Sequence, residues 1–207
     1  MTLTELSVQD LIAAFRSPEP TPGGGSAAAL TGAIGAALLA MVSSLSRPRA
    51  STPDDVERLA DASRRCTELS KELTALVDRD SDAYRAVVAA YRLPKSTPDE
   101  ADQRTARIQE ALLGATTTPL DVIRRCSAAI AQAATVASLG NRNASSDVLS
   151  GLELLSAGLR AALLNVEINL NSLKDAGLGA GIRNEASRLL AGAIEDAAAA
   201  RRLIEEP

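Results

Sequence analysis

The chain has 207 residues and a formal charge of −4, and it contains no His, no Trp, two Tyr and one Phe. Without His, neither a Ser–His or Cys–His nucleophile pair nor a His-based zinc site can form, so proton transfer must fall to Asp, Glu, Lys or Tyr. The negative charge and the scarcity of aromatic side chains argue against nucleic-acid binding. We therefore expect a carboxylate as the catalytic group of any enzyme built from this chain, and no metal site.

The composition also predicts the fold class. Forty Ala and twenty-nine Leu, with few β-branched or aromatic residues, favour closely packed helices over strands. We expect an all-α fold, a single domain over residues 1–207 with about six or seven helices. Cys66 and Cys126 lack CxxC spacing, which indicates buried, unpaired thiols in a reducing compartment. The first fifteen residues do not form a secretory signal, so we expect a cytoplasmic protein.

The first helices follow from caps and breakers. Ser7 and Asp10 form a capping pair that opens a short helix ending near Phe15, and a Pro- and Gly-rich run over residues 17–26 then interrupts the chain. An apolar helix at about 26–45 follows, without a charged residue between positions 23 and 46. Its length would suit a membrane span. Because Ala, Gly, Ser and Thr contribute little transfer energy, we expect a buried central helix and no membrane association.

A long helix is predicted at about 52–91. Thr52 is a helix cap followed by Pro at the first helical position and two acids, and no breaker appears before Pro94. Apolar residues recur along it in an a/d heptad pattern, which we call the seam. Asp80 alone places a charge in the seam, whose positions are Leu59, Ala62, Cys66, Leu69, Leu73, Leu76, Asp80, Ala83, Val87 and Ala90.

The second half of the chain is predicted as four further helices. The first opens at Thr97 and ends near Thr116, and the next runs from Thr118 to Leu139 because Pro119 suits a first helical position. Another opens at residues 146–147 and carries an apolar stripe to position 173, and an Ala-rich closing helix covers residues 182–206.

Asp80 is the strongest candidate for chemistry. A carboxylate in a desolvated seam has a raised pKa unless a cation or several donors pair with it, and such a group is a useful acid or base near neutral pH. The alternative is a structural ion pair with an Arg of a neighbouring helix. Tyr84 lies one turn further on and could line the same cleft or cover the edge of the seam.

Other polar positions allow both a binding and a structural interpretation. The loop at residues 23–26 (GGGS) opens a helix, where backbone N–H groups attract anions, or it is a flexible turn capped by Ser26. Cations at the end of the long helix suit an anionic substrate tail or the helix dipole. Amides on a buried face need partners. These cations and the remaining polar candidates are Arg92, Lys95, Asn141, Asn143, Asp147, Asn165 and Asn169.

Five segments, at residues 20–26 (PTPGGGS), 80–84 (DSDAY), 92–95 (RLPK), 140–147 (GNRNASSD) and 165–170 (NVEINL), carry a family resemblance. In this order they resemble the cyclodeaminase/cyclohydrolase family, which comprises the C-terminal half of formiminotransferase-cyclodeaminase and stand-alone methenyltetrahydrofolate cyclohydrolases. The chain departs from the family at residues 47–50 (RPRA), where members often have a Gly and Lys stretch, so that segment is not assigned substrate contacts.

The resemblance implies an all-helical homodimer or higher homo-oligomer that acts on tetrahydrofolate derivatives without a metal or organic cofactor. The family's Asp-x-x-Ala-aromatic motif falls on Asp80, Ala83 and Tyr84, which makes Asp80 the proton donor and acceptor. The implied substrate is a folate, including polyglutamylated forms. The residues expected to bind it are Pro22, Gly23, Gly24, Gly25, Ser26, Tyr84, Arg92, Lys95, Asn141, Asn143, Asp147, Asn165 and Asn169.

Three functions remain open at this point. The first is methenyltetrahydrofolate cyclohydrolase, favoured because the sequence contains no formiminotransferase half. The second is formimidoyltetrahydrofolate cyclodeaminase, which closes 5-formiminotetrahydrofolate to the methenyl compound with release of ammonia. The third is a non-catalytic helical folate-binding or assembly protein, against which the intact Asp80 argues.

Overall fold

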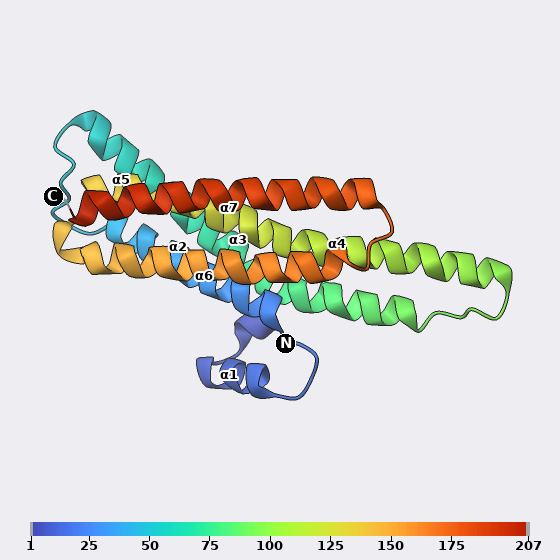
Figure 1. The fold of residues 1–207 in the computed structure, drawn as a ribbon. Helices are drawn as coiled ribbons and strands as arrows, with labels where there is room; N and C mark the ends of the chain where they lie inside the picture. Colours follow the sequence, from blue (N-terminus) through green and yellow to red (C-terminus); the bar gives the residue numbers. More distant parts are fainter. Residues whose placement is uncertain (1, 206–207) are drawn as a thin grey trace.

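The computed structural model describes residues 2–205, and within them the chain forms a helical bundle without β-strands (Figure 1). The all-α prediction is therefore confirmed. The closing helix was predicted to extend to residue 206, which lies outside the described residues. The helices are the 3-10 helices η1 (Leu3–Glu5) and η2 (Arg142–Ala144), and α1 (Val8–Arg16), α2 (Gly24–Ser43), α3 (Pro53–Tyr91), α4 (Pro98–Ile130), α5 (Ala133–Leu139), α6 (Ser145–Leu170) and α7 (Ala176–Glu205).

α2 is the central helix of the bundle. It packs along α3 on one side and α6 on the other, and it also touches α4. α2 is long and apolar enough to cross a membrane by length and composition, but 56% of its apolar window is buried inside the protein. The predicted role of this helix as the buried centre of a bundle is confirmed.

Glycines allow α2 and α6 to approach closely. A Cβ added to Gly35 would lie 2.8 Å from the carbonyl oxygen of Gly151, and one added to Gly158 would lie 2.8 Å from that of Ala28. Both distances are shorter than van der Waals contact, and the obstructing atoms belong to helix backbone, which cannot rotate away. The two helices therefore pack backbone against backbone.

This packing predicts opposite effects of two Gly→Ala substitutions. Gly158→Ala is expected to lower the free energy of unfolding by about 1–3 kcal/mol, because α6 must move away from α2. Gly192→Ala in α7 is the control, since a Cβ there meets no atom within 4 Å. It should raise the free energy of unfolding by about 0.5–1 kcal/mol through helix propensity. Urea unfolding measures both, and effects of the same sign would contradict the packing argument.

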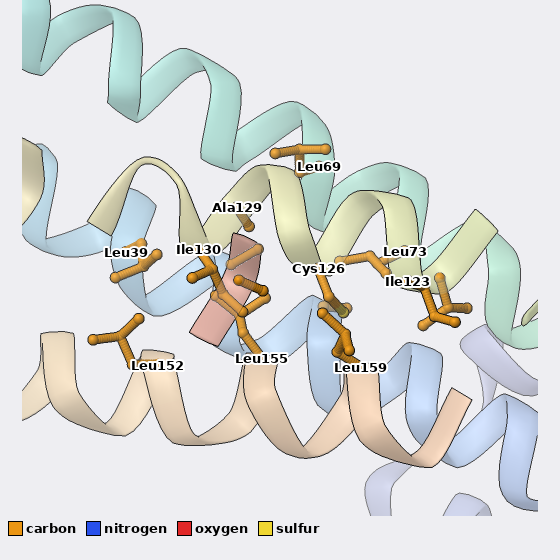
Figure 2. Packing of buried hydrophobic residues seen from close by; sticks show 14 of the residues in the cluster. Leu39, Leu69, Leu73, Ile123, Cys126, Ala129, Ile130, Leu152, Leu155 and Leu159 are labelled. Atoms are coloured by element: carbon orange, nitrogen blue, oxygen red, sulfur yellow. The ribbon is translucent and has the colours of Figure 1, made fainter. Parts of the chain in front are cut away.

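The core lies where α2, α3, α4 and α6 meet. Leucines and isoleucines of these helices interdigitate around Cys126 (Figure 2). Cys66 and Cys126 are both buried and unpaired, as predicted, and burial raises the pKa of each thiol to about 12. Both thiols are therefore protonated and unreactive at neutral pH.

α3 matches its prediction closely. The Thr52 side chain accepts a hydrogen bond from the Asp55 N–H, with Pro53 at the first helical position. The seam is buried from Leu59 to Leu76, and the next buried positions shift to Val77 and Ser81. The seam position Ala90, near the end of the helix, is buried in a separate cluster with Ile108 and Leu112. The drift to Val77 and Ser81 is expected of a straight helix of 3.6 residues per turn. It leaves Asp80 half-buried at the edge of the seam.

The predicted helix break between Thr116 and Thr118 is wrong, because α4 continues through Pro119 to Ile130. Proline has no N–H, so the carbonyl of Ala115, four residues earlier, loses its helical partner. The Asn169 Nδ2 of α6 donates to that carbonyl at 2.7 Å. This bond replaces the missing helical one, and the chain breaks later, at residues 131–132 between α4 and α5.

Candidate active site

Four elements enclose a cleft of about 290 Å³ at the N-terminal end of α2. The loop before α2 and its first turn form one wall, α3 contributes Asp80, and α4 and α6 close the other sides. The lining combines a carboxylate, a phenol and two amides with backbone and apolar groups. Its members are Pro20, Thr21, Gly23, Gly24, Gly25, Asp80, Tyr84, Val87, Leu112, Ala115, Asn165 and Asn169.

Asp80 is held by hydrogen bonds and not by a cation. The Ser26 Oγ lies 3.1 Å from Asp80 Oδ2, and the nearby Ser26 backbone N–H also lowers the pKa of this carboxylate. None of the ion pairs found within residues 2–205 includes Asp80, so the alternative of a structural ion pair with Arg is not seen. Desolvation by burial raises the pKa of Asp80, and the Ser26 hydrogen bonds oppose that rise only in part.

The glycine loop brings the backbone of α2 against this carboxylate. Gly23 is the N-cap, and Gly24 and Gly25 form the first turn, so Ser26 is not the cap that one interpretation of the loop required. A Cβ on Gly25 would lie only 2.0 Å from Asp80 Oδ1. Any side chain at that position would displace the carboxylate, and the approach of α2 to Asp80 therefore requires glycine.

Two asparagines of α6 face the cleft with fixed amide orientations. The Asn165 Nδ2 donates to the carbonyl of Ala161 at 2.9 Å, and the Asn169 Nδ2 donates to that of Ala115. A carbonyl can only accept, so these bonds assign nitrogen and oxygen in both amides. Within the described residues neither Oδ1 accepts a hydrogen bond, so both remain available to a ligand that presents N–H groups.

The remaining wall is apolar. Val87, Leu112 and Ala115 line it, and Tyr84, with 42% of its surface exposed, lies at the mouth. A flat heteroaromatic ring could lie against such a surface while its polar edge meets the asparagines.

Four of the predicted binding residues lie near the cleft without lining it. One of them, Ser26, is fully buried next to Asp80 and is not exposed to a substrate as predicted. Pro22 lines the neighbouring depression next to Asp78 and Ser81. Arg92 and Lys95 are exposed at the end of α3 and in the turn to α4. Arg92 is eight residues beyond Tyr84, about 12 Å along the helix at 1.5 Å per residue. The two cations therefore lie beyond the mouth of the cleft.

Asn141, Asn143 and Asp147 lie at the opposite end of α2. The Asn141 Nδ2 donates to the carbonyl of Ser46, just past the end of that helix, and its Oδ1 accepts from the Asn143 N–H. Asp147 lies in the first turn of α6. The twenty residues of α2 separate this group from the cleft by about 30 Å. Grouping these three residues with Asp80 is therefore not seen within one chain, and the Asn141 side chain binds backbone groups of Ser46 and Asn143.

Sequence reasoning missed the apolar wall and one polar residue. Leu112 and Ala115 carry no signal of a site, because apolar residues on a helix are ordinarily core. Ser81 follows Asp80 directly and lies 3.2 Å from Ser26 through their hydroxyl oxygens. Its burial in a charged stretch of α3 would have become visible only once the drift of the seam was taken into account.

A helical bundle with a desolvated carboxylate in a small cleft defines a candidate acid–base site, and comparisons with known proteins give the family. Residues 7–188 match the formiminotransferase-cyclodeaminase family model, and the chain belongs to that family. It is 41% identical over 171 residues to a methenyltetrahydrofolate cyclohydrolase of Methylorubrum extorquens, covering 82% of this chain and 81% of that one.

Two further relatives carry the cyclodeaminase name. The chain is 33% identical over 201 residues to the rat formimidoyltransferase-cyclodeaminase. The matched region covers 95% of this chain but only 36% of the rat protein. The crystal structure of a formiminotetrahydrofolate cyclodeaminase from Thermotoga maritima matches with a TM-score of 0.86 at 26% identity, over 98% of this chain and 97% of that one. The similarity therefore extends over the whole bundle.

Proposed function

We propose that this chain is a folate one-carbon enzyme that hydrolyses 5,10-methenyltetrahydrofolate to a formyltetrahydrofolate. The observation that carries the proposal is the half-buried Asp80 carboxylate, which has a raised pKa and no cationic partner within residues 2–205, in a cleft that two asparagines also line. The 41% identical relative that bears the cyclohydrolase name supports this choice.

The reaction requires one group that first accepts and then donates a proton. The Asp80 carboxylate faces the cationic methenyl bridge and takes a proton as water adds to the bridging carbon. The resulting acid gives that proton to the nitrogen that leaves the tetrahedral carbon. The second proton of the water is released as the formyl carbonyl forms, so Asp80 begins and ends the cycle as a carboxylate. No cofactor is required in this scheme.

The other cleft residues bind and orient the substrate in this proposal. The Oδ1 atoms of Asn165 and Asn169 accept from N–H groups of the pterin, and its ring lies along the Leu112 side of the cleft. The N-terminal turn of α2 and the cations Arg92 and Lys95 are assigned to the carboxylates of the glutamyl tail. We also propose a homodimer or higher homo-oligomer in the cytoplasm.

The cyclodeaminase reaction is the second candidate. It passes through the same kind of tetrahedral carbon between two nitrogens, with ammonia as the leaving group, and the Thermotoga maritima structure and the rat relative carry that name. Asp80 would protonate the amino group on the tetrahedral carbon, which then leaves as ammonia. A non-catalytic folate-binding protein is the third candidate, and it does not explain why the carboxylate lacks a counter-charge.

One comparison of rates tests the proposal. Loss of methenyl absorbance and release of ammonia from 5-formiminotetrahydrofolate are measured at the same enzyme concentration, with the enzyme-free rate subtracted. We expect kcat/KM for methenyl hydrolysis to exceed that for ammonia release by at least about tenfold. The reverse order would assign the cyclodeaminase reaction. Folate binding without turnover of either substrate would assign the non-catalytic role.

A further inference from the structure

Two buried hydroxyl groups lie behind Asp80. Ser26 is fully buried and Ser81 is 2% exposed. The Ser26 Oγ lies 2.8 Å from the carbonyl oxygen of Val77, 3.1 Å from Asp80 Oδ2 and 3.2 Å from the Ser81 Oγ. A serine hydroxyl has a single proton and two lone pairs. Ser26 therefore cannot donate fully to both Val77 and Asp80, although it can accept from Ser81 in either orientation.

We propose that Ser26 and Ser81 form a hydroxyl relay in which Ser26 changes its acceptor with the protonation state of Asp80. Ser81 is a positioning residue in this relay, because it acts on Asp80 only through Ser26. The inference rests on the proposed function, since it explains how one carboxylate is kept ready both to accept and to donate a proton.

In the carboxylate state, the Ser26 hydroxyl donates to Asp80 Oδ2 and the Ser81 hydroxyl donates to Ser26. Hydrogen bonds to an ionised acceptor are stronger than neutral ones, so the Ser26 proton turns to Asp80 and not to the carbonyl of Val77. The Ser81 bond polarises the Ser26 hydroxyl and strengthens its donation. The Val77 carbonyl keeps its main-chain hydrogen bond within α3.

In the acid state, the bonds rearrange without any proton leaving its oxygen. The protonated Asp80 Oδ2–H group donates to the Ser26 Oγ, and the Ser26 hydroxyl rotates so that it donates to the carbonyl of Val77. Ser81 continues to donate to Ser26, whose second lone pair is free. Neither state leaves a buried hydroxyl unpaired, so one rotation allows Asp80 to change protonation state within the protein.

No other charged group of the cleft competes with this relay. Among the described residues that line the cleft, Tyr84 is the other titratable side chain, and α2 has no charged residue. The lining residues of α4 and α6 are apolar or amide groups. On α3 itself, Asp78 is hydrogen-bonded to the N-terminal segment and Asp82 pairs with Arg85.

The test compares Ser26→Ala, Ser81→Ala, the double variant and Ser70→Ala. Ser70 is the matched control, because its hydroxyl also joins α3 to α2, by donating to the carbonyl of Ala33 at 2.9 Å. Two measurements are made: the pH dependence of kcat for methenyl hydrolysis, and the infrared carboxyl stretch of Asp80 against pH, assigned by its loss in Asp80→Asn. The infrared titration does not depend on activity, so it tests the relay even if the proposed function fails.

We expect Ser26→Ala to move the midpoint of the Asp80 titration upward by about one pH unit, the size of a hydrogen bond to a charged group. Ser81→Ala should move it upward by about 0.3 of a unit, and Ser70→Ala should leave it unchanged. The double variant should match Ser26→Ala alone, because Ser81 has no second route to Asp80. Ser26→Cys, with its weaker donor, takes the place of Ser26→Ala if that variant does not fold.

Two results would overturn the relay. One is an additive double variant, which would mean that Ser81 acts on Asp80 independently of Ser26. The other is an equal shift in Ser81→Ala and Ser70→Ala, which would indicate a general loosening of the contact between α2 and α3.

Discussion

Replacing Asp80 by Asn is expected to lower kcat for methenyltetrahydrofolate hydrolysis by at least about 100-fold, the usual effect of removing a general acid or base. The amide has nearly the shape of the carboxylate and still accepts from Ser26, so the cleft keeps its form. The substitution removes only the capacity to carry a proton and the negative charge opposite the methenyl bridge. Turnover close to that of the wild type, in a folded variant, would remove Asp80 from the mechanism.

The same substitution should stabilise the fold at neutral pH. Burial raises the pKa of Asp80 in the folded protein above its value in the unfolded chain, so the folded state holds this proton more tightly. Stability therefore falls as pH rises from about 4, where an unfolded Asp titrates, through the folded pKa. Above this range the wild type bears the cost of a desolvated charge, and Asp80→Asn does not.

Urea unfolding at several pH values measures this difference. The free energy of unfolding of Asp80→Asn should exceed that of the wild type at pH 7, and the gain should disappear below about pH 4, where both side chains are neutral. Asp82→Asn is the matched control, because Asp82 is exposed on the same helix and pairs with Arg85. It should show no such gain, and a stabilisation equal in both variants would point to relief of general negative charge.

Most helices of this fold could be predicted because their signals are local. Thr52 and Thr97 each cap a helix whose first residue is Pro, and α3 and α4 begin at Pro53 and Pro98. The break predicted near Pro119 failed for a non-local reason. A proline inside a helix is tolerated when another group takes the freed carbonyl, and here that group is Asn169, 50 residues further along the chain.

The site was predictable only in its most unusual residue. Asp80 stood out as the single charge in an apolar repeat, and the structure places it on the cleft with the glycine loop and the two asparagines of α6. Ser81 was not predicted, because it is not an a or d position of the heptad pattern. It is buried because the apolar face of a straight helix drifts away from those positions. The distance between Asn141 and the cleft could not be predicted from the sequence either. It depends on the tertiary packing, which places Asn141 at one end of α2 and the cleft at the other.

A methyl group at Gly25 is expected to lower kcat by at least about 100-fold, because it would occupy the position of the Asp80 carboxylate. The added Cβ would lie 2.0 Å from Oδ1 and 2.5 Å from the carboxyl carbon, so Asp80 must move by more than 1 Å. Displacements of that size cost about 100-fold in catalysis. Gly25 does not have a positive φ, so alanine fits the backbone and the effect comes from the contact alone.

Gly24→Ala separates this contact from a general effect on the helix. Its Cβ would lie 3.4 Å from the Asn165 Nδ2, close to ordinary contact, so we expect kcat to change by no more than about threefold. The double variant Gly25→Ala/Asp80→Asn should turn over no more slowly than Asp80→Asn alone, because Gly25 matters through the position of one carboxylate. A further loss of kcat in the double variant would mean that the α2 backbone at Gly25 affects the reaction by a route other than the position of Asp80. Circular dichroism and unfolding curves establish that each variant is folded before the rates are compared.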